Sequence, residues 1–371
     1  MASMEGALRM TILYIIASPT WGGGEQYIYN LAQHLQAQYG IKPYFLFPPH
    51  SSKEMVERFE QVGECQVFPY ASKLWRFIPL AGKKLAQLID KWQIDIVQIN
   101  NRMTYFAAAY AKRYAHHSFR LIAVQHLVRK AKKSFFWKWA YRQMDVLICV
   151  SKCVRKTYLA PFDGEKVFPD VRVIYNSVPV SQEEAVQPKP DTLLTLLFHG
   201  RICREKGIEP LFEALAQIAD LPFRMIFAGN IGKKDQDLWN RLMAKTPVKD
   251  KIEYIGFQSD MHQLLSKCHI GISPSIVREA GSLAVIEHIA YGLAVVTSNN
   301  GSQPELIRDG ENGLLCPPDN PQALAKALRR LLTDRALCRK LGTQAQHDFF
   351  AYHTYDRFIE EMFDLYRETI K

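Results

Sequence analysis

Residues 273–287 read Ser273-Pro274-Ser275-Ile276-Val277-Arg278-Glu279-Ala280-Gly281-Ser282-Leu283-Ala284-Val285-Ile286-Glu287. An apolar run, Ile270–Ile272, comes directly before this stretch, and an amphipathic segment closed by Gly292 follows it. This order predicts a buried strand, a loop and a helix whose first turn Ser282 can cap. Because ligands of α/β folds bind beyond the carboxyl ends of their strands, we expect a binding site in this loop.

The predicted junction carries two carboxylates, Glu279 in the loop and Glu287 inside the helix. A helical glutamate taken alone is more often a solvated surface residue, because charges are rarely buried unless paired. Here, however, the amides of Leu283 and Ala284 fall between the two carboxylates, in a first helical turn that attracts anions. Hydroxyl-binding carboxylates on both sides of a phosphate-binding turn predict a nucleotide sugar as ligand.

Strand and helix patterns alternate on both sides of this junction, which predicts parallel sheets with helices on both faces. Residues 181–190 are polar and without periodicity, so we interpret them as part of a linker. The expected fold is α/β, with two doubly wound Rossmann-like domains facing a central cleft. The expected parts are an N-terminal domain (1–178), a linker (179–192), a second domain (193–351) and a C-terminal helix (352–371) that packs back on the first domain. The predicted strands are Met10–Ala17, Lys42–Phe47, Ile94–Ile99, Leu121–Gln125, Val146–Val150 and Val171–Tyr175, then Leu193–Phe198, Arg224–Ala228, Ile252–Ile255, Ile270–Ile272 and Ala294–Thr297.

Length and charge limit the class of protein. A chain of 371 residues fits two domains, and its 48% hydrophobic and 23% charged residues are ordinary for a globular protein. The net charge of +10 belongs to the first 178 residues, which carry 24 Lys and Arg against 12 Asp and Glu. This half is therefore expected to meet an anionic surface, either a membrane or a nucleic acid.

The seven cysteines show neither paired nor metal-ligand spacing, so we expect reduced thiols and no metal site. No run approaches the roughly 20 apolar residues that cross a bilayer, which favours a cytoplasmic protein. Residues 1–9 have no pattern of their own, and Met10 is the expected natural start.

Three further motifs are candidates for ligand binding. The glycine turn Gly22–Gly24 precedes a predicted helix; it lacks the third glycine of a dinucleotide fingerprint and the lysine of a P-loop, which leaves a plain tight turn or backbone approach to a phosphate or sugar. The loop His199–Gly207 contains Arg201 and Lys206, which either are solvated or neutralise a diphosphate. His126 ends a predicted strand, where a structural and a ligand-binding role remain equally open.

Residues 129–142 combine six basic and five aromatic side chains with no acid. This composition suits the headgroup region of an anionic membrane, but it also suits stacking on a single-stranded nucleic acid or an ordinary amphipathic helix. The expected membrane or acceptor contacts are Arg129, Lys130, Lys132, Lys133, Phe135, Phe136, Trp137 and Trp139.

The order of these motifs resembles the retaining glycosyltransferases of family four, which have the GT-B fold. The resemblance extends from Gly22-Gly23-Gly24-Glu25 through Gly200–Gly207, Ser273-Pro274-Ser275 and Glu279–Glu287 to Asp309-Gly310-Glu311-Asn312-Gly313. Two departures stand out. Ala280-Gly281-Ser282 occupies positions where many relatives have proline, an aromatic residue and glycine, and Leu127 follows His126 where an acid is usual.

The resemblance implies transfer of a sugar, with retained configuration, from a nucleotide diphosphate sugar, for which we expect UDP, and with no metal or other cofactor. Arg201 and Lys206 match positions that hold the diphosphate, Glu279 the contact to the transferred sugar, and Glu287 the contact to the ribose. His126 matches a histidine at the reaction centre, so the implied catalytic residues are Glu279, Arg201, Lys206 and His126. The implied donor-binding residues are Gly23, Gly24, Gly200, Asn230, Phe257, Ser282, Leu283, Ala284 and Glu287.

The expected acceptor is a glycan or a lipid-linked sugar of the bacterial cell envelope, such as a polysaccharide or lipopolysaccharide, handled by a peripheral protein at the inner membrane. Two alternatives stay open from the residues alone. A nucleic-acid-binding protein would use the basic half, although no nucleic-acid partner is expected. A glycoside hydrolase would use the two carboxylates, but it would leave Arg201 and Lys206 without an anion to bind.

Overall fold

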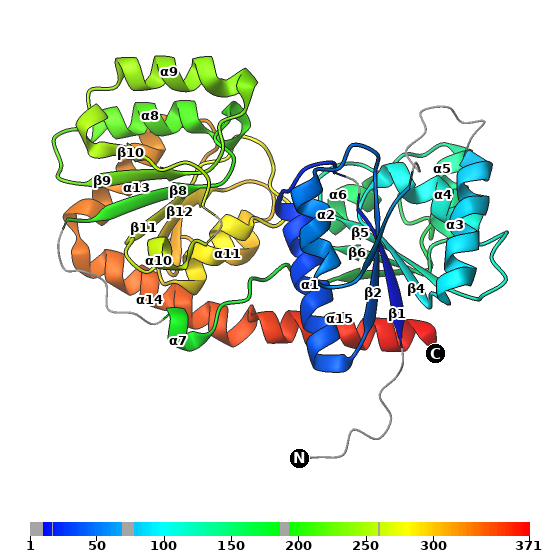
Figure 1. Cartoon of the computed structure of the whole chain (residues 1–371). Helices are drawn as coiled ribbons and strands as arrows, with labels where there is room; N and C mark the ends of the chain where they lie inside the picture. Colours follow the sequence, from blue (N-terminus) through cyan, green and yellow to red (C-terminus); the bar gives the residue numbers. More distant parts are fainter. Residues whose placement is uncertain (1–9, 17, 69–77, 186–192, 259) are drawn as a thin grey trace. The chain divides into compact units, whose positions relative to one another are not determined.

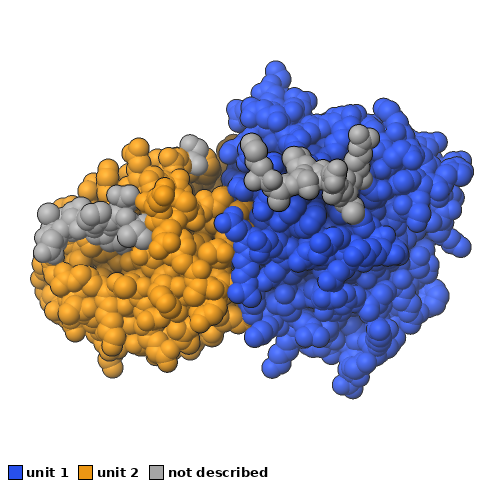
Figure 2. Space-filling model, turned by 90° about the horizontal axis from the view of Figure 1, so that it is seen from below, with its two compact units in different colours: residues 1–176, 356–371 blue, residues 177–355 orange. Residues whose placement is uncertain are grey.

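The computed structural model describes residues 10–16, 18–68, 78–185, 193–258 and 260–371. The expectations for residues 1–9, for Ala17 at the end of the first predicted strand and for part of the linker, residues 186–192, lie outside these ranges. The chain divides into two compact units (Figures 1 and 2). Unit 1 comprises residues 1–176 and 356–371, and unit 2 comprises residues 177–355.

Unit 1 contains a parallel sheet of seven strands in the order β3-β2-β1-β4-β5-β6-β7. The order reverses between β1 and β4, so loops following these two strands diverge at the carboxyl edge. The six strands predicted for this half are present, with ends that differ by up to two residues. β3 was missed because it is short and largely exposed at the sheet edge, which leaves no apolar run in the sequence. The strands are β1 Thr11–Ile15, β2 Lys42–Phe47, β3 Glu64–Val67, β4 Ile96–Ile99, β5 Arg120–Gln125, β6 Val146–Cys149 and β7 Asp170–Val173.

Helices cover both faces of this sheet (Figure 1). The last helix of the chain belongs to this unit: Tyr366 donates a hydrogen bond to the buried Gln98 of β4, and Phe363 stacks on Tyr39 with ring centroids 3.7 Å apart. The helices are α1 Gly23–Tyr39, α2 Lys53–Glu60, α3 Ile78–Trp92, α4 Tyr105–Ala111, α5 Phe135–Arg142, α6 Lys152–Leu159 and α15 Tyr355–Ile370.

Unit 2 contains a second parallel sheet of six strands in the order β10-β9-β8-β11-β12-β13, which reverses between β8 and β11. All five strands predicted here are present, and the edge strand β13 was not predicted. The strands are β8 Thr195–His199, β9 Arg224–Ala228, β10 Ile252–Tyr254, β11 Ile270–Ser273, β12 Ala294–Ser298 and β13 Gly313–Cys316.

The two faces of this sheet carry separate hydrophobic cores, because successive side chains of a strand point to opposite faces. Leu196 and Phe198 of β8 belong to the core under α8, α9 and α13, whereas Leu197 belongs to the core under α11 and α14 (Figure 1). The helices are α7 Gln182–Ala185, α8 Ile208–Gln217, α9 Gln236–Lys245, α10 His262–Leu265, α11 Leu283–Ala290, α12 Gln303–Leu306, α13 Pro321–Thr333 and α14 Arg335–Tyr352.

The described part of the expected linker is not detached from this unit. Ala185 of α7 is buried in the core beneath α11, and its carbonyl accepts a hydrogen bond from Gln346 at 3.2 Å. A single buried alanine in a polar stretch gives no periodicity, which is why the sequence did not indicate this packing.

Candidate functional site

The carboxylates of the opening stretch lie where the second sheet reverses its strand order. The loop 200–207 follows β8, and the loop 274–282 follows β11, the neighbouring strand across the reversal. In doubly wound sheets this point opens into a crevice because the two connections leave toward opposite faces. The site is thus built from two loops that are 73 residues apart along the chain, as measured from Lys206 to Glu279.

Glu279 is held by two donors in this loop pair. Its Oε1 lies 2.7 Å from Lys206 Nζ and 2.7 Å from Ser275 Oγ, and its side chain is only 14% exposed. Partial burial strengthens such a charge-assisted bond relative to a surface pair. Glu279 and Lys206, predicted separately as sugar and diphosphate contacts, therefore contact each other directly.

The two loops are also joined through their backbones. Ile276 donates its amide to the carbonyl of Glu205 at 3.1 Å. Gly207 has φ +77°, and a Cβ there would lie 2.0 Å from the carbonyl oxygen of Pro274. Only glycine satisfies both the left-handed conformation and this close approach, so the last residue of the His199–Gly207 motif fixes the distance between the loops.

Glu287 lies on α11 and forms a hydrogen bond with a histidine that was not among the predicted site residues. Its Oε2 is 2.5 Å from His199 Nε2, and His199 Nδ1 is 3.0 Å from His288 Nε2. His199 is the last residue of β8, and His288 follows Glu287 on the helix. Sequence reasoning quoted His199 only as the start of the basic loop.

The first turn of α11 has the predicted cap. Ser282 Oγ accepts a hydrogen bond from the amide of Val285 at 3.4 Å, and Ser282 is buried. The amides of Leu283 and Ala284 donate to no acceptor within the described part of the chain. These groups and the helix dipole make the turn between Glu279 and Glu287 suitable for an anion.

The remaining predicted residues of this unit surround the same edge of the sheet. Arg201 is exposed and has no ion pair among the described residues, unlike Lys206. Gly200 follows β8 with φ +120°, and Asn230 follows β9, where its carbonyl accepts the amide of Ile202 at 2.9 Å. Phe257 follows β10 and is 57% exposed.

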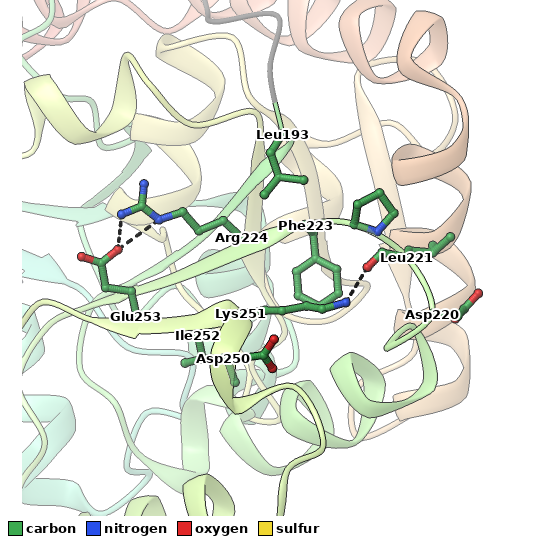
Figure 3. Close-up of a pocket in the computed structure, with 10 residues that line it drawn as sticks. Leu193, Asp220, Leu221, Phe223, Arg224, Asp250, Lys251, Ile252 and Glu253 are labelled. Carbon is green, nitrogen blue, oxygen red and sulfur yellow. Dashed lines mark hydrogen bonds and ion pairs between the residues drawn. The ribbon is translucent and has the colours of Figure 1, made fainter.

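A hollow of about 650 Å³ opens at the opposite, amino edge of the sheet (Figure 3). Most of its charged groups already have partners: Arg224 pairs with Glu253, Lys251 donates to the carbonyl of Leu221 at 2.7 Å, and Asp220 pairs with Arg329. The hollow is not the candidate site, because the predicted site residues lie at the other edge of the sheet. It is lined by Leu193, Asp220, Leu221, Pro222, Phe223, Arg224, Asp250, Lys251, Ile252 and Glu253.

In unit 1, the glycine turn forms the start of α1. Gly23 and Gly24 are exposed in the first turn of this helix, next to Glu25, which is buried. Burial raises the pKa of Glu25, although hydrogen bonds from backbone amides of its own residue, Ser18 and Gly22 oppose the shift. Burial of this acid was not predicted, since a glutamate in the first turn of a helix is usually solvated.

His126 follows β5 at the carboxyl edge of the first sheet. Its Nε2 is 3.1 Å from Asn100 Oδ1, and its ring meets Tyr27 edge-on with centroids 4.9 Å apart. Burial lowers the pKa of His126 to about 4, so the ring is neutral at pH 7. Asn100 directly follows β4, one of the two strands between which the order of the first sheet reverses. His126 therefore lies close to this reversal point.

Two family models match the chain in succession. The one described as Glycosyltransferase Family 4 matches residues 21–182, and the one described as Glycosyl transferases group 1 matches residues 180–348. Every loop described above lies within these matches. The chain is a GT-B glycosyltransferase of the family-four type. This match favours a glycosyltransferase over the two alternatives that the residues left open, a glycoside hydrolase and a nucleic-acid-binding protein.

Individual relatives agree with the family. This glycosyltransferase is 26% identical over 317 residues to an uncharacterized glycosyltransferase of Methanocaldococcus jannaschii, covering 77% of this chain and 78% of the relative. It is 25% identical to the lipopolysaccharide core biosynthesis glycosyltransferase LpsE of Rhizobium meliloti, covering 60% and 72%.

Solved structures share the fold of this glycosyltransferase. A glycosyltransferase from Rickettsia africae has a TM-score of 0.84 at 21% identity, with 98% of this chain and 99% of that chain covered. HepE of Anabaena in complex with UDP has a TM-score of 0.80 at 18% identity, with 97% and 100% covered. At these identities the likeness establishes the GT-B fold.

The basic aromatic segment of this glycosyltransferase is only partly helical. α5 begins at Phe135, and Phe135 and Phe136 are 75% and 60% exposed. Lys130, Lys132 and Lys133 precede the helix and are exposed. We call these five residues the Lys130–Phe136 cluster.

Other members of the segment are not at the surface in the expected way. Trp137 is buried and packs edge-on against Phe106 with centroids 4.7 Å apart, which corrects its assignment as a membrane contact. Trp139 is half-buried against Tyr110. Burial lowers the pKa of Arg129, which is half-buried as well.

Glu165 neutralises part of the segment from a distant turn, binding Lys138 at 2.5 Å and Arg142 at 3.5 Å. A count of charges along residues 129–142 could not reveal this partner. Within the residues that the structure describes, no helix is both long and apolar enough to span a bilayer.

Proposed function

We propose that this glycosyltransferase transfers a sugar from a UDP-sugar, with retained anomeric configuration, to a glycan or lipid-linked acceptor of the bacterial cell envelope. The observation that carries the proposal is the first turn of α11 at the reversal point of the second sheet, where the amides of Leu283 and Ala284 fall between Glu279 and Glu287 along the chain. Binding of UDP and UDP-glucose by HepE supports the choice of nucleotide, and LpsE supports an envelope glycan.

In this proposal the diphosphate occupies the α11 turn and is neutralised by Arg201 and Lys206. Arg201 needs no rearrangement, since it is exposed and without an ion pair among the described residues. Lys206 exchanges Glu279 for a phosphate oxygen, which releases a carboxylate to accept hydrogen bonds from the transferred sugar. Glu287 binds the ribose, and the backbone and side chains of Gly200, Asn230, Phe257 and Ser282 complete the donor contacts.

The reaction breaks the bond between the anomeric carbon and the diphosphate through an oxocarbenium-like state. The leaving phosphate takes the proton of the acceptor hydroxyl on the face from which it departs, so the new bond forms on that same face. Arg201 and Lys206 stabilise the charge that develops on the leaving group, a role for which we propose no metal. Within unit 1, the neutral ring of His126 offers a hydrogen-bonding group, and Gly23 and Gly24 offer backbone amides.

A turnover assay with candidate sugar nucleotides and an envelope extract as acceptor tests this proposal. Glu279→Gln is expected to reduce consumption of one UDP-sugar by about 100-fold, as for loss of a group that positions the reacting centre. Glu213→Gln, a matched change on the exposed face of α8, is expected to leave the rate unchanged. If no sugar nucleotide binds or turns over, the proposal fails; an inverted product overturns the retaining mechanism alone.

We also propose that the enzyme acts at the inner membrane face through the Lys130–Phe136 cluster. Three exposed lysines beside two exposed phenylalanines combine attraction to anionic lipid with insertion of apolar side chains. Pairing of Lys138 and Arg142 with Glu165 leaves the positive charge concentrated on the residues before α5.

Vesicle sedimentation tests this surface. Wild type should bind phosphatidylglycerol vesicles and not phosphatidylcholine vesicles, and the triple variant K130Q/K132Q/K133Q should lose most of that binding. The matched control K245Q/K249Q/K326Q removes equal charge from exposed positions of unit 2 and should retain it. Equal loss in both variants would point to net charge rather than to this cluster, and salt-sensitive binding to single-stranded DNA instead of vesicles would favour a nucleic acid.

A further inference from the structure

The contact of Glu287 with His199 continues into a chain of three polar side chains. Glu287 is 26% exposed at its side chain, His199 is 8% exposed, and His288 is fully buried. This row of three hydrogen-bonded side chains therefore extends from the surface of the site into the core. Of the three residues, the family resemblance implies a role only for Glu287.

The second sheet leaves space for the ring of His288, the buried end of this row of side chains. His288 packs on Gly271 in the middle of β11, where a Cβ would lie 2.3 Å from His288 Cγ. The rings of His288 and His199 meet edge-on, with centroids 4.7 Å apart and an angle of 82°. A glycine in an interior strand is otherwise unfavourable, so this position is shaped for the imidazole.

The carboxylate of Glu287 determines which ring nitrogens of His199 carry a hydrogen. A carboxylate only accepts, so His199 Nε2 carries a hydrogen and donates it to Glu287. In neutral His199 the Nδ1 atom then accepts from His288 Nε2; in protonated His199 it donates to that atom. In both states His199 is held at its two nitrogens, and it holds one oxygen of Glu287.

We propose that His199 and His288 are positioning residues that fix the orientation of Glu287 for the ribose of the donor. With Oε2 bound to His199, Oε1 is the oxygen presented to the ribose hydroxyls. A side chain with several rotatable bonds is thereby fixed in one orientation before the ligand arrives, which reduces the entropy lost on binding. This inference rests on the proposed function, since it requires Glu287 to contact the ribose.

Calorimetric titration with UDP and with 2′,3′-dideoxy-UDP tests the inference, because only the first nucleotide has the hydroxyls that Glu287 would bind. Wild type is expected to prefer UDP by about 10- to 100-fold, the range for hydrogen bonds to a charged group. His199→Phe keeps a planar ring but neither nitrogen, and it should reduce this preference to a few-fold by weakening UDP alone. His199→Gln retains a donor and an acceptor and should restore part of the preference.

His269→Gln is the matched control. His269 lies at the amino edge of the same sheet, where its Nδ1 accepts the amide of Thr195 at 3.1 Å. The control should leave the preference for UDP at the wild-type value even if it lowers the Tm. Because the readout is a ratio of two affinities for one protein, a uniform loss of folded protein does not change it.

The outcomes separate the two proposals. If wild type binds UDP and Glu287→Gln abolishes the preference but His199→Phe does not, the positioning role is overturned and the donor site stands. If His199→Phe weakens both nucleotides equally, His199 supports the fold only, and the inference is overturned as well. If wild type does not bind UDP, the proposed donor fails and this inference fails with it.

Discussion

Substitution of Gly271 by alanine is expected to destabilise unit 2 through a single buried contact. The new Cβ would lie 2.3 Å from Cγ, 2.4 Å from Nδ1 and 2.8 Å from Cδ2 of His288. Carbon atoms normally pack about 3.5–4.0 Å apart, so the ring must retreat by more than about 1 Å. The strand cannot move instead, because β11 is paired on both sides, with β8 and with β12.

The magnitude follows from the two contacts that change. Overpacking of a core costs about 1–3 kcal/mol, and loss of the hydrogen bond to His199 adds about 1 kcal/mol. Gly271→Ala should therefore lower the free energy of unfolding of unit 2 by about 2–4 kcal/mol. For a unit of this size this corresponds to a decrease in Tm of roughly 5–15 °C.

Differential scanning calorimetry of four proteins measures the effect: wild type, Gly271→Ala, His288→Ala and the double variant. In the double variant the added methyl group occupies space vacated by the ring, so it should be no less stable than His288→Ala alone. Gly24→Ala is the control, since a Cβ at Gly24 in α1 meets nothing within 4 Å, and its Tm should be no lower than that of the wild type. Strictly additive decreases in the double variant would refute the clash as the cause.

Three other changes have effects that follow from single contacts. Arg201→Gln should reduce turnover of the UDP-sugar by about 100-fold, because it removes a charge that stabilises the leaving diphosphate. The control Arg204→Gln changes a side chain that is 61% exposed and paired with Glu209, and it should alter turnover less than about twofold. Equal effects of the two variants would contradict a specific contact of Arg201 with the diphosphate. Burial alone would raise the pKa of Asp348, but hydrogen bonds and the pair with Arg308 outweigh it and lower the pKa, so ionised Asp348 stabilises the fold above its unfolded pKa of about 3.9. The Tm deficit of Asp348→Asn should accordingly be largest near pH 7 and shrink as the pH falls through the folded pKa, and a pH-independent deficit in thermal scans would contradict this. Tyr366→Phe leaves a buried amide oxygen of β4 without its donor and should cost about 1–3 kcal/mol in urea unfolding; an unchanged midpoint would show that the bond does not contribute.

Most of the fold could be predicted from the sequence because buried parallel strands are written as continuous apolar runs. Lys42–Phe47 and Arg224–Ala228 match β2 and β9 to the residue. The two edge strands that were missed, β3 and β13, lack such a run or lie within a glycine-rich motif. Edge position alone does not explain these failures, since the edge strands β7 and β10 were predicted from their apolar residues.

The sequence predicted those features of the site that depend on residues close together in the chain. The cap at Ser282 and the placement of Glu279 in a loop are confirmed, since both follow from residues a few positions apart. The pairing of Glu279 with Lys206, and that of Glu287 with His199, join segments that the chain order alone does not bring together. The functional roles of these residues stay predictions.

The burial of Trp137 shows a different limit. An interleaved run of basic and aromatic residues predicts a surface, but the helix that contains Trp137 turns that ring toward Phe106 and leaves Phe135 outside. Helical periodicity predicts which side chains are buried only when the first residue of the helix is known. Here α5 begins six residues after the start of the basic run.

The return of α15 to unit 1 has a consequence for synthesis of the chain on the ribosome. Unit 2 is continuous from residue 177 to 355, whereas unit 1 needs the last 16 residues, 356–371, to complete its packing. The first part of unit 1 therefore emerges before unit 2 but is completed after it, and until residues 356–371 are synthesised it exposes the apolar surface around Tyr27 and Tyr39 that α15 later covers. A nonsense mutation shortly before residue 356 would consequently damage unit 1, parts of which lie more than 300 positions upstream, as the 335-residue separation of Tyr27 and Met362 illustrates.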